Sequence, residues 1–406
     1  MAAANNTLLT PDQITREALR ILHEKLSFVR SINRQYDDSF AQKGAKIGDT
    51  LRIRMPVQYN VTDGATFVRQ DSVEQNISLS VTRRKHVGMG FTSNDLTMDI
   101  DNFSRRFVEP AMSRLAAEVE TDAIASASKL TYNQVGSAGS VPNSLKTYLL
   151  GRAKLNQFLA PKDKRTQMVS SIQSAEIVDA LKALFNDQSE VSKQYKEGLM
   201  GRTAGADWVE SESIYTHVNG TGTVTNAVDA TVAVDGTDQL ALKSLGNAGT
   251  VTVGTVLTIA GVFAVHPETK VTRNAVLQQF VVTAVPGAAD STGDLTVTVS
   301  PKMYYGSTPR KNISAAPQAD AEVKFVGVAS TGYEQGLLFQ EDAFTFATAD
   351  LELPQAAGFK SRQTYDGLSL RLVGDYNITD DESLYRIDIL YGFGALRPEH
   401  ACRVTS

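Results

Sequence analysis

The chain has 406 residues, of which 42% are hydrophobic and 21% charged, and its formal net charge is -5. This composition indicates a globular protein of two or three domains, and the acidic balance argues against wrapping by nucleic acid. The single cysteine, Cys402, excludes internal disulfides and cysteine-based zinc sites, and it indicates a reducing compartment. The sequence start shows no secretory signal pattern, and no apolar run is long enough to span a bilayer.

The first 48 residues are expected to form an arm that contains an amphipathic helix. Thr10 and Pro11 resemble a helix cap followed by proline at the first helical position. Apolar residues recur at helical spacing from Ile14 to Leu26, which predicts a helix over residues 11–30. Its polar face is either a solvated surface or a docking surface for an acidic partner.

Residues 49–91 have the alternating pattern of a long two-stranded β-hairpin. In the stretch LRIRMPVQYN every second residue is apolar, and the residues between them include Arg52 and Arg54. Pro56 has no backbone donor, which favours an edge strand or an extended arm. The alternation resumes after a turn around Asp63-Gly64 and continues to the end of the range.

The second predicted strand carries a basic run, Arg83-Arg84-Lys85-His86. No aromatic residues interleave with it, so it is a weak candidate for nucleic-acid binding. Salt bridging or protection of a strand edge explains the run better, because charged strands resist unwanted pairing.

Residues 92–135 contain a second predicted helix, which is long and carries a narrow apolar stripe. Asp99 or Asp101 could cap its start, and Pro110 should either bend it or mark the first turn of its second half. The stripe recurs every four residues, as expected for a helix beneath a sheet, at Phe103, Phe107, Ala111, Leu115, Val119 and Ala123.

The composition changes twice in the remaining chain. Residues 136–217 mix helical and strand patterns, whereas residues 218–332 are rich in Val, Thr, Ala and Gly and poor in charge. Short strand patterns separated by turns at intervals of about ten residues predict a small all-β barrel or sandwich. The mixed composition returns in residues 333–406, so the all-β module is best interpreted as an insertion.

No motif indicates an active site, and we expect neither an enzyme nor a cofactor. The five histidines are scattered, and none has a metal-ligand spacing. The sequence contains no nucleophile elbow and no phosphate-binding loop. Asp380-Asp381-Glu382 could bind a cation, but a polar turn between two strands explains it more simply.

The order of these elements resembles the HK-ninety-seven fold of tailed-phage major capsid proteins. NFSRRFVEPAMSRLAAEVETDAI resembles the spine helix of that family, and GLLFQEDAFTFATADLELP resembles the strand that follows the insertion. SLYRIDILYGFGALRPEHACRV resembles the C-terminal strand. GTVLTIAGVFAVHPETKVTRNAVLQQFVVTAV is similar to the inserted β-barrel of P-twenty-two-type podovirus coat proteins.

The resemblance implies an α+β fold in which an all-β barrel interrupts a capsid-type domain. Its parts would be an N-terminal arm (1–48), an extended-loop hairpin (49–91) and a peripheral domain with the spine helix (92–135). The axial domain and the remaining peripheral strands would share residues 136–217 and 333–406. The inserted barrel would cover residues 218–332.

The resemblance also implies a function. The chain would be a major capsid protein that assembles with a scaffolding protein into an icosahedral shell of hexamers and pentamers around double-stranded DNA. A portal protein and a decoration protein would be further candidate partners, the DNA would be bound without sequence specificity, and assembly would take place in the bacterial host cytoplasm.

In this fold the hairpin lies across a neighbouring subunit, which gives candidate contact residues. Those for intersubunit contacts are Arg52, Arg54, Tyr59, Phe67, Arg69, Arg83 and Arg84. Those for the scaffold are on the N-terminal helix, at Arg16, Arg20 and Arg30.

Two departures from the founding pattern of the fold refine this expectation. About 48 residues precede the hairpin, which leaves no room for a fused scaffolding segment, so a separate scaffolding protein is expected. The hairpin contains no lysine between Gly48 and Thr82, which disfavours an isopeptide crosslink from its loop and favours a noncovalent shell.

Three alternatives remain open. An oligomeric phage tail or adhesin protein would explain the β-rich module but not the long helix and hairpin. A hydrolase with an accessory β-domain lacks any catalytic set. An encapsulin-like compartment shell shares the fold, although the inserted domain and the C-terminal resemblance favour the viral coat.

Overall fold

The computed structural model describes residues 11–34, 50–59, 61, 64–65, 67, 69, 74–92, 107–181, 201–355 and 357–406. The chain divides into two compact units, each assembled from separate segments. Unit 1 takes its residues from Met1–Ile53, Ile77–Ala123 and Phe344–Gly394. Unit 2 takes its residues from Arg54–Asn76, Ile124–Ala343 and Ala395–Ser406.

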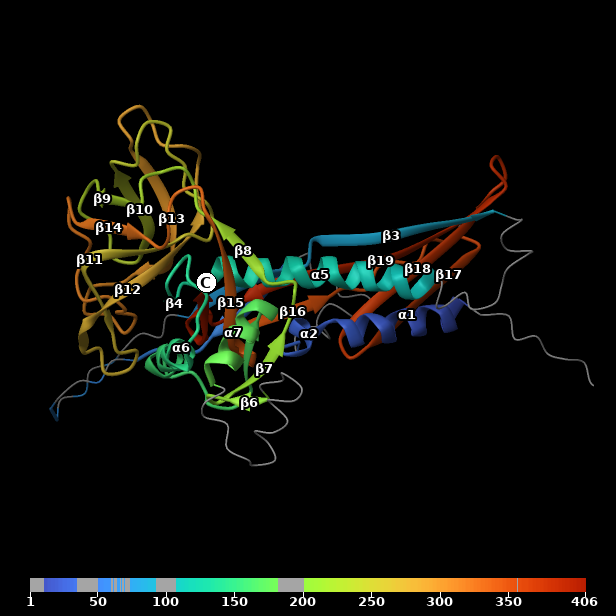
Figure 1. The fold of residues 1–406 in the computed structure, drawn as a ribbon, viewed down its shortest axis with the longest axis horizontal. Helices are drawn as coiled ribbons and strands as arrows, with labels where there is room; N and C mark the ends of the chain where they lie inside the picture. Colours follow the sequence, from blue (N-terminus) through green and yellow to red (C-terminus); the bar gives the residue numbers. More distant parts are fainter. Residues whose placement is uncertain are drawn as a thin grey trace, which may run out of the picture. The chain divides into compact units, whose positions relative to one another are not determined.

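Unit 1 is built on a five-stranded antiparallel sheet (Figure 1). Its strands follow the order β16-β19-β18-β17, and β3 also pairs with β19. The strands are β3 (Arg83–Thr92), β16 (Phe344–Thr348), β17 (Phe359–Tyr365), β18 (Leu368–Asn377) and β19 (Glu382–Ala395).

Alternation along the strands divides this sheet into an apolar and a charged face. Leu372 lies opposite Ile387 in the pairing of β18 with β19, and both are buried. The next pair along, Arg371 and Asp388, points to the other face because successive strand residues alternate. Ser361, in register with Leu372, hydrogen-bonds Asp12 of the N-terminal helix, so this helix lies on the apolar face.

The predicted N-terminal helix is present, but it is divided at Leu26. Helix α1 covers Pro11–Lys25 and helix α2 covers Ser27–Arg30. The backbone of Leu26 has a ψ of 89°, which is not helical, although its side chain is buried. The apolar spacing continues across this interruption. It therefore predicted the buried face correctly but gave no sign of the break in the helix.

The second long helix, α5, covers Glu109–Leu130. Pro110 lies in the first turn of α5, directly after the π-helical residues 107–108, and proline is tolerated in the first turn of an α-helix. Of the two roles expected for this proline, the first turn of the second half of the helix agrees with this position, although the part of the predicted helix before residue 107 lies outside the described residues. Leu115 and Val119 of the predicted stripe are buried. Asp99, Asp101 and Phe103 lie outside the described residues.

The hairpin is shorter than its alternation predicts. Strands β1 (Thr50–Met55) and β2 (Gln75–Ser80) form a separate two-stranded sheet, whereas β3 pairs along its full length with β19. A Cβ at Gly392 of β19 would lie 2.3 Å from the carbonyl oxygen of Ser80, so the chain crosses β19 where that strand has no side chain. The strands within residues 49–91, which were expected to form one hairpin, therefore belong to two different sheets.

Unit 2 contains a mixed seven-stranded sheet in the order β4-β20-β15-β5-β7-β6, with β8 also paired to β15. The helices of this part are α6 (Leu145–Gln157) and α7 (Ser171–Leu181), with 3-10 turns η3 (Glu341–Ala343) and η4 (Pro398–His400). Its strands are β4 (Gln134–Gly136), β5 (Arg165–Val169), β6 (Arg202–Thr203), β7 (Ala206–Glu210), β8 (Tyr215–Val218), β15 (Gly332–Gln340) and β20 (Ala401–Thr405).

Unit 2 also contains a closed six-stranded β-barrel, which lies within the predicted all-β range (Figure 1). Inward-facing residues such as Leu240, Leu257, Phe280 and Val297 are completely buried and form its core. In barrel order the strands are β10 (Thr237–Lys243), β13 (Leu295–Met303), β12 (Thr272–Ala284), β11 (Val256–Val265), β14 (Glu322–Phe325) and β9 (Thr225–Val228).

Candidate functional site

Burial along the hairpin decreases from its root to its far end. At the root, Ile53 is 8% exposed and Leu79 only 1%. Farther out, Tyr59 is 66%, Phe67 88% and Val61 96% exposed. An isolated aromatic residue on a surface is ordinary, but several large apolar side chains on one extended arm are typical of a surface that binds another protein.

The arginines predicted on the hairpin are also exposed. Arg52 and Arg69 face solvent. Arg54 lies 3.6 Å from Glu74, and both side chains are more than half exposed, so water screens this pair strongly. The hairpin therefore presents guanidinium groups together with apolar side chains, a combination that is common at protein interfaces.

Arg83, by contrast, contacts a carboxylate of its own unit. Its Nη1 lies 2.9 Å from Asp122 of α5, and the hydroxyl of Tyr391 donates to the same carboxylate over 2.7 Å. Lys85 lies 3.8 Å from Glu118. Arg83 and Lys85 are two residues apart on a strand, and Glu118 and Asp122 are four residues apart on a helix. Both separations are about 6–7 Å, so the basic side chains of β3 have the same spacing as the carboxylates of α5.

Arg84 belongs to a cluster around Asp388, whose side chain is completely buried. Burial disfavours the charged form of Asp388, but hydrogen bonds from the guanidinium groups hold its pKa below the usual value. The contacts to this carboxylate are from Arg371 at 2.6 Å, Arg386 at 2.7 Å and Arg84 at 3.2 Å.

Sequence reasoning did not identify this cluster, although it did favour salt bridging for the run that contains Arg83 and Arg84. The available signal was charged residues at alternating positions in LSLRLVGDY and SLYRIDILYG. Neither stretch reveals which strand lies beside the other, and the pairing of β18 with β19 is what brings Arg371 opposite Asp388.

The scaffold candidates Arg16, Arg20 and Arg30 are all exposed on α1 and α2. Arg20 lies 2.7 Å from Glu17 and 2.6 Å from Glu24 of the same helix, so its charge is largely offset within α1.

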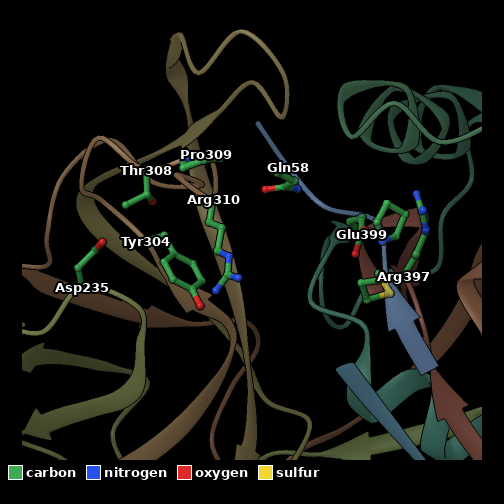
Figure 2. Close-up of a pocket in the computed structure, with 10 residues that line it drawn as sticks. Gln58, Asp235, Tyr304, Thr308, Pro309, Arg310, Arg397 and Glu399 are labelled. Atoms are coloured by element: carbon green, nitrogen blue, oxygen red, sulfur yellow. The ribbon is translucent and has the colours of Figure 1, made fainter. Parts of the chain in front are cut away.

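A cleft of about 420 Å³ in unit 2 lies between the hairpin, the barrel and η4 (Figure 2). Figure 2 shows Arg310 and Tyr304 of the barrel on one side, with Arg397 and Glu399 on the other. Its lining combines two guanidinium groups and two carboxylates with apolar hairpin residues. This mixture is suited to contact with a polypeptide. The lining residues are Met55, Pro56, Gln58, Asp235, Tyr304, Thr308, Pro309, Arg310, Arg397 and Glu399.

Cys402, His217 and His400 are reactive side chains that the fold buries. Burial raises the pKa of Cys402 to about 12 and lowers those of His217 and His400 to about 4, so all three are neutral near pH 7. Within the described ranges no group of three or more His, Cys, Asp or Glu residues could hold a metal ion. No helix there is long and apolar enough to cross a membrane.

Comparison with known proteins gives one family and several structures. The family model described as "P22 coat protein - gene protein 5" matches residues 3–403. A chain from Mycobacterium phage Che8 is 12% identical with a TM-score of 0.50, covering 93% of this chain and 90% of that one. This similarity shows a shared fold.

Two further structures have lower TM-scores of 0.44. "Capsid structure of the Cyanophage P-SCSP1u" is 11% identical and covers 88% of this chain and 83% of that one. "Asymmetric unit of bacteriophage PhiM1 mature capsid" is 10% identical and covers 88% and 82%. Comparison with curated proteins found no match.

Proposed function

Since the chain belongs to the P22 coat protein family, and is therefore a structural coat protein of a phage capsid and not an enzyme, we propose how it builds its shell. It assembles with a separate scaffolding protein into an icosahedral shell of hexamers and pentamers that encloses double-stranded DNA. A portal protein occupies one opening, a decoration protein is a further candidate partner, and assembly takes place in the host cytoplasm.

The exposed end of the hairpin is the observation that carries this proposal. Tyr59, Val61 and Phe67 are each more than 60% exposed in the single chain, although burial of such side chains is favourable. In the proposed shell they lie against a neighbouring subunit, and Arg52, Arg54 and Arg69 meet carboxylates there. The hairpin corresponds to the extended loop of the HK-ninety-seven fold, and α5 to its spine helix.

Arg83 and Arg84 have a different role in this proposal. Because both contact carboxylates within unit 1, they stabilise the subunit rather than its contacts with neighbours. On the N-terminal helix, Arg16 and Arg30 remain the stronger candidates for scaffold contact, since the charge of Arg20 is offset by Glu17 and Glu24.

The overall charge supports a container for DNA rather than a DNA-binding protein. Tight binding of double-stranded DNA requires many phosphate contacts from Lys and Arg. A wall with a formal net charge of -5 per chain holds the genome without sequence-specific contacts and does not fix it in place.

Negative-stain microscopy tests the proposal, with the full chain expressed alone and together with the scaffolding protein of its phage. Uniform closed shells are expected only in the second sample. The double variant Arg52→Glu/Arg54→Glu should remain unassembled, because it reverses the charge of the exposed hairpin.

Arg114→Glu is the matched control, since Arg114 is an exposed arginine on α5 that pairs with Glu118. It should assemble normally. Small spikes in place of shells would contradict the coat assembly. Normal shells from the hairpin variant would contradict the contact assigned to Arg52 and Arg54.

A further inference from the structure

Strand β4 lies at the end of the seven-stranded sheet, where no other strand of the described part of the chain pairs with one side of its backbone. On its inner side β4 pairs in parallel with β20, and the N–H of Arg403 donates to the carbonyl of Asn133 over 2.8 Å. Backbone groups of successive strand residues point to opposite sides. The N–H and C=O of the next residue, Gln134, therefore point outward, where an additional strand could pair.

The side chain of Gln279, from barrel strand β12, occupies this outer position. The N–H of Gln134 donates to Oε1 of Gln279, and Nε2 of Gln279 donates to the carbonyl of Gln134, each over 3.0 Å. A primary amide carries a donor and an acceptor side by side, as a peptide group does. Gln279 therefore makes the two hydrogen bonds that a residue of an adjacent antiparallel strand would make.

Further contacts fix the barrel at this edge. Nη1 of the buried Arg403 donates to the carbonyl of Gly254, in the turn before β11, over 2.8 Å. Nη2 of Arg273 donates to the carbonyl of Gln157, at the end of α6, over 2.5 Å. Like the bonds of Gln279, these two bonds join a side chain to a backbone group. They can therefore form only while the backbone segments of Gly254 and Gln157 stay in place.

An apolar seam lies beside these hydrogen bonds. Tyr132, two residues before Gln134, packs with Val256 and Val281 of the barrel. Tyr132 is also in edge-to-face contact with Phe158, their ring centroids being 5.9 Å apart. The seam excludes water, and hydrogen bonds near a dry contact are more costly to lose than exposed ones.

We propose that Gln279 closes the outer edge of β4 in place of a strand, and that this closure prevents a strand of a second copy of the chain from pairing there. An open edge strand is a template for association with another chain, and proteins protect such edges in specific ways. The inserted barrel thus has a role within the single subunit: it covers an edge that would otherwise compete with correct assembly.

The test uses the full chain as unassembled subunits, below the concentration at which the unmodified protein forms shells. Gln279→Met removes both polar atoms but keeps an unbranched side chain of similar length. Hydrogen–deuterium exchange of a peptide covering residues 131–137 should become faster by about tenfold or more at Gln134, since two hydrogen bonds are lost. Sedimentation velocity should show dimers of the variant.

Two further variants make the result decisive. Gln239→Ala removes a barrel glutamine whose side chain bonds Thr298 and Asp238, so exchange at 131–137 should stay unchanged. Gln279→Glu keeps the volume and an acceptor for the N–H of Gln134, but it replaces the amide donor to the carbonyl of Gln134 by an oxygen. It should raise exchange at 131–137 less than Gln279→Met does, and it keeps the test open if Gln279→Met folds poorly.

Unchanged exchange at 131–137 in both Gln279 variants would overturn the closure, as would an equal rise in peptides from β11 and β13. Faster exchange with subunits that remain monomeric would overturn the guarding role. Since every measurement is made on free subunits, none of these results depends on how the shell forms.

Discussion

Two buried charges, one in each unit, are accommodated in opposite ways. Asp388 in unit 1 is surrounded by three guanidinium groups, which keep its carboxylate ionised despite burial. Arg403 in unit 2 forms no ion pair with any carboxylate in the described segments, and it donates to the carbonyl of Gly254. Burial is the main influence on Arg403 and lowers its pKa.

Unit 1 thus buries a charge together with partners of opposite charge, whereas unit 2 buries a charge that donates to a backbone carbonyl. Buried ion pairs contribute little when intact but cost much when one partner is removed. Neutral buried groups such as His217 respond instead to pH. The two units should therefore fail under different perturbations.

The largest effect is expected for Asp388→Ala. It leaves the guanidinium groups of Arg84, Arg371 and Arg386 without their shared carboxylate and should lower the free energy of unfolding of unit 1 by about 3–5 kcal/mol. Urea denaturation measures this change. Asp380→Ala, in the exposed turn between β18 and β19, is the control and should change stability by less than about 0.5 kcal/mol. Equal effects would show that the cluster does not hold the sheet.

Acidification should act on unit 2 before unit 1. The pKa values of His217 and His400 are about 4 in the folded chain, against about 6.5 when unfolded. Between these values the unfolded chain binds more protons, so stability present above pH 6.5 is lost as pH falls toward 4. Each histidine contributes about 1.4 kcal/mol per pH unit in this window.

Urea denaturation midpoints, measured at several pH values with a probe in each unit, show which unit loses stability first as the pH falls. The contribution of Asp388 is lost only below its ordinary pKa of about 3.9, because its folded pKa is lowered. His217→Gln should flatten the pH dependence of unit 2. An unchanged slope would exclude His217 as a source of the acid sensitivity.

The smallest effect is expected for Arg83→Ala. Its side chain is partly exposed, and Tyr391 continues to donate to Asp122 after the arginine is removed. The loss should be at most about 1 kcal/mol and should shrink further at high salt. Thermal unfolding at two salt concentrations measures both. A loss as large as that of Asp388→Ala would place Arg83 among the essential buried pairs.

Local patterns in the sequence predicted the elements better than their partners. The four-residue stripe that includes Leu115 and Val119 indicated α5, and evenly spaced strand patterns indicated the barrel. Both signals arise because one side of a single helix or strand is buried, and this burial determines the residue pattern of that element alone. The hairpin was identified for the same reason, although its second strand was extended too far.

Relations between distant segments were not predictable in this way. The alternation of β3 is the same whether it pairs with β2 or β19, so the change of sheet after Ser80 leaves no periodic signal. Gln279 and Gln134 are 145 residues apart, and neither residue type indicates a side chain that imitates a strand. The hairpin residues named from a resemblance are exposed in the single chain, and their contact with a neighbouring subunit stays a prediction.

The crossing at Gly392 has a mechanical consequence. This glycine lets the chain leave the hairpin close to the backbone of β19, so the contact sets the direction in which β1 and β2 project. The six residues of β1 extend about 20 Å, so a tilt of about 5° at the root moves the far end by about 2 Å. If the hairpin lies against a neighbouring subunit as proposed, the angle between adjacent subunits in the shell should respond to one added methyl group at Gly392.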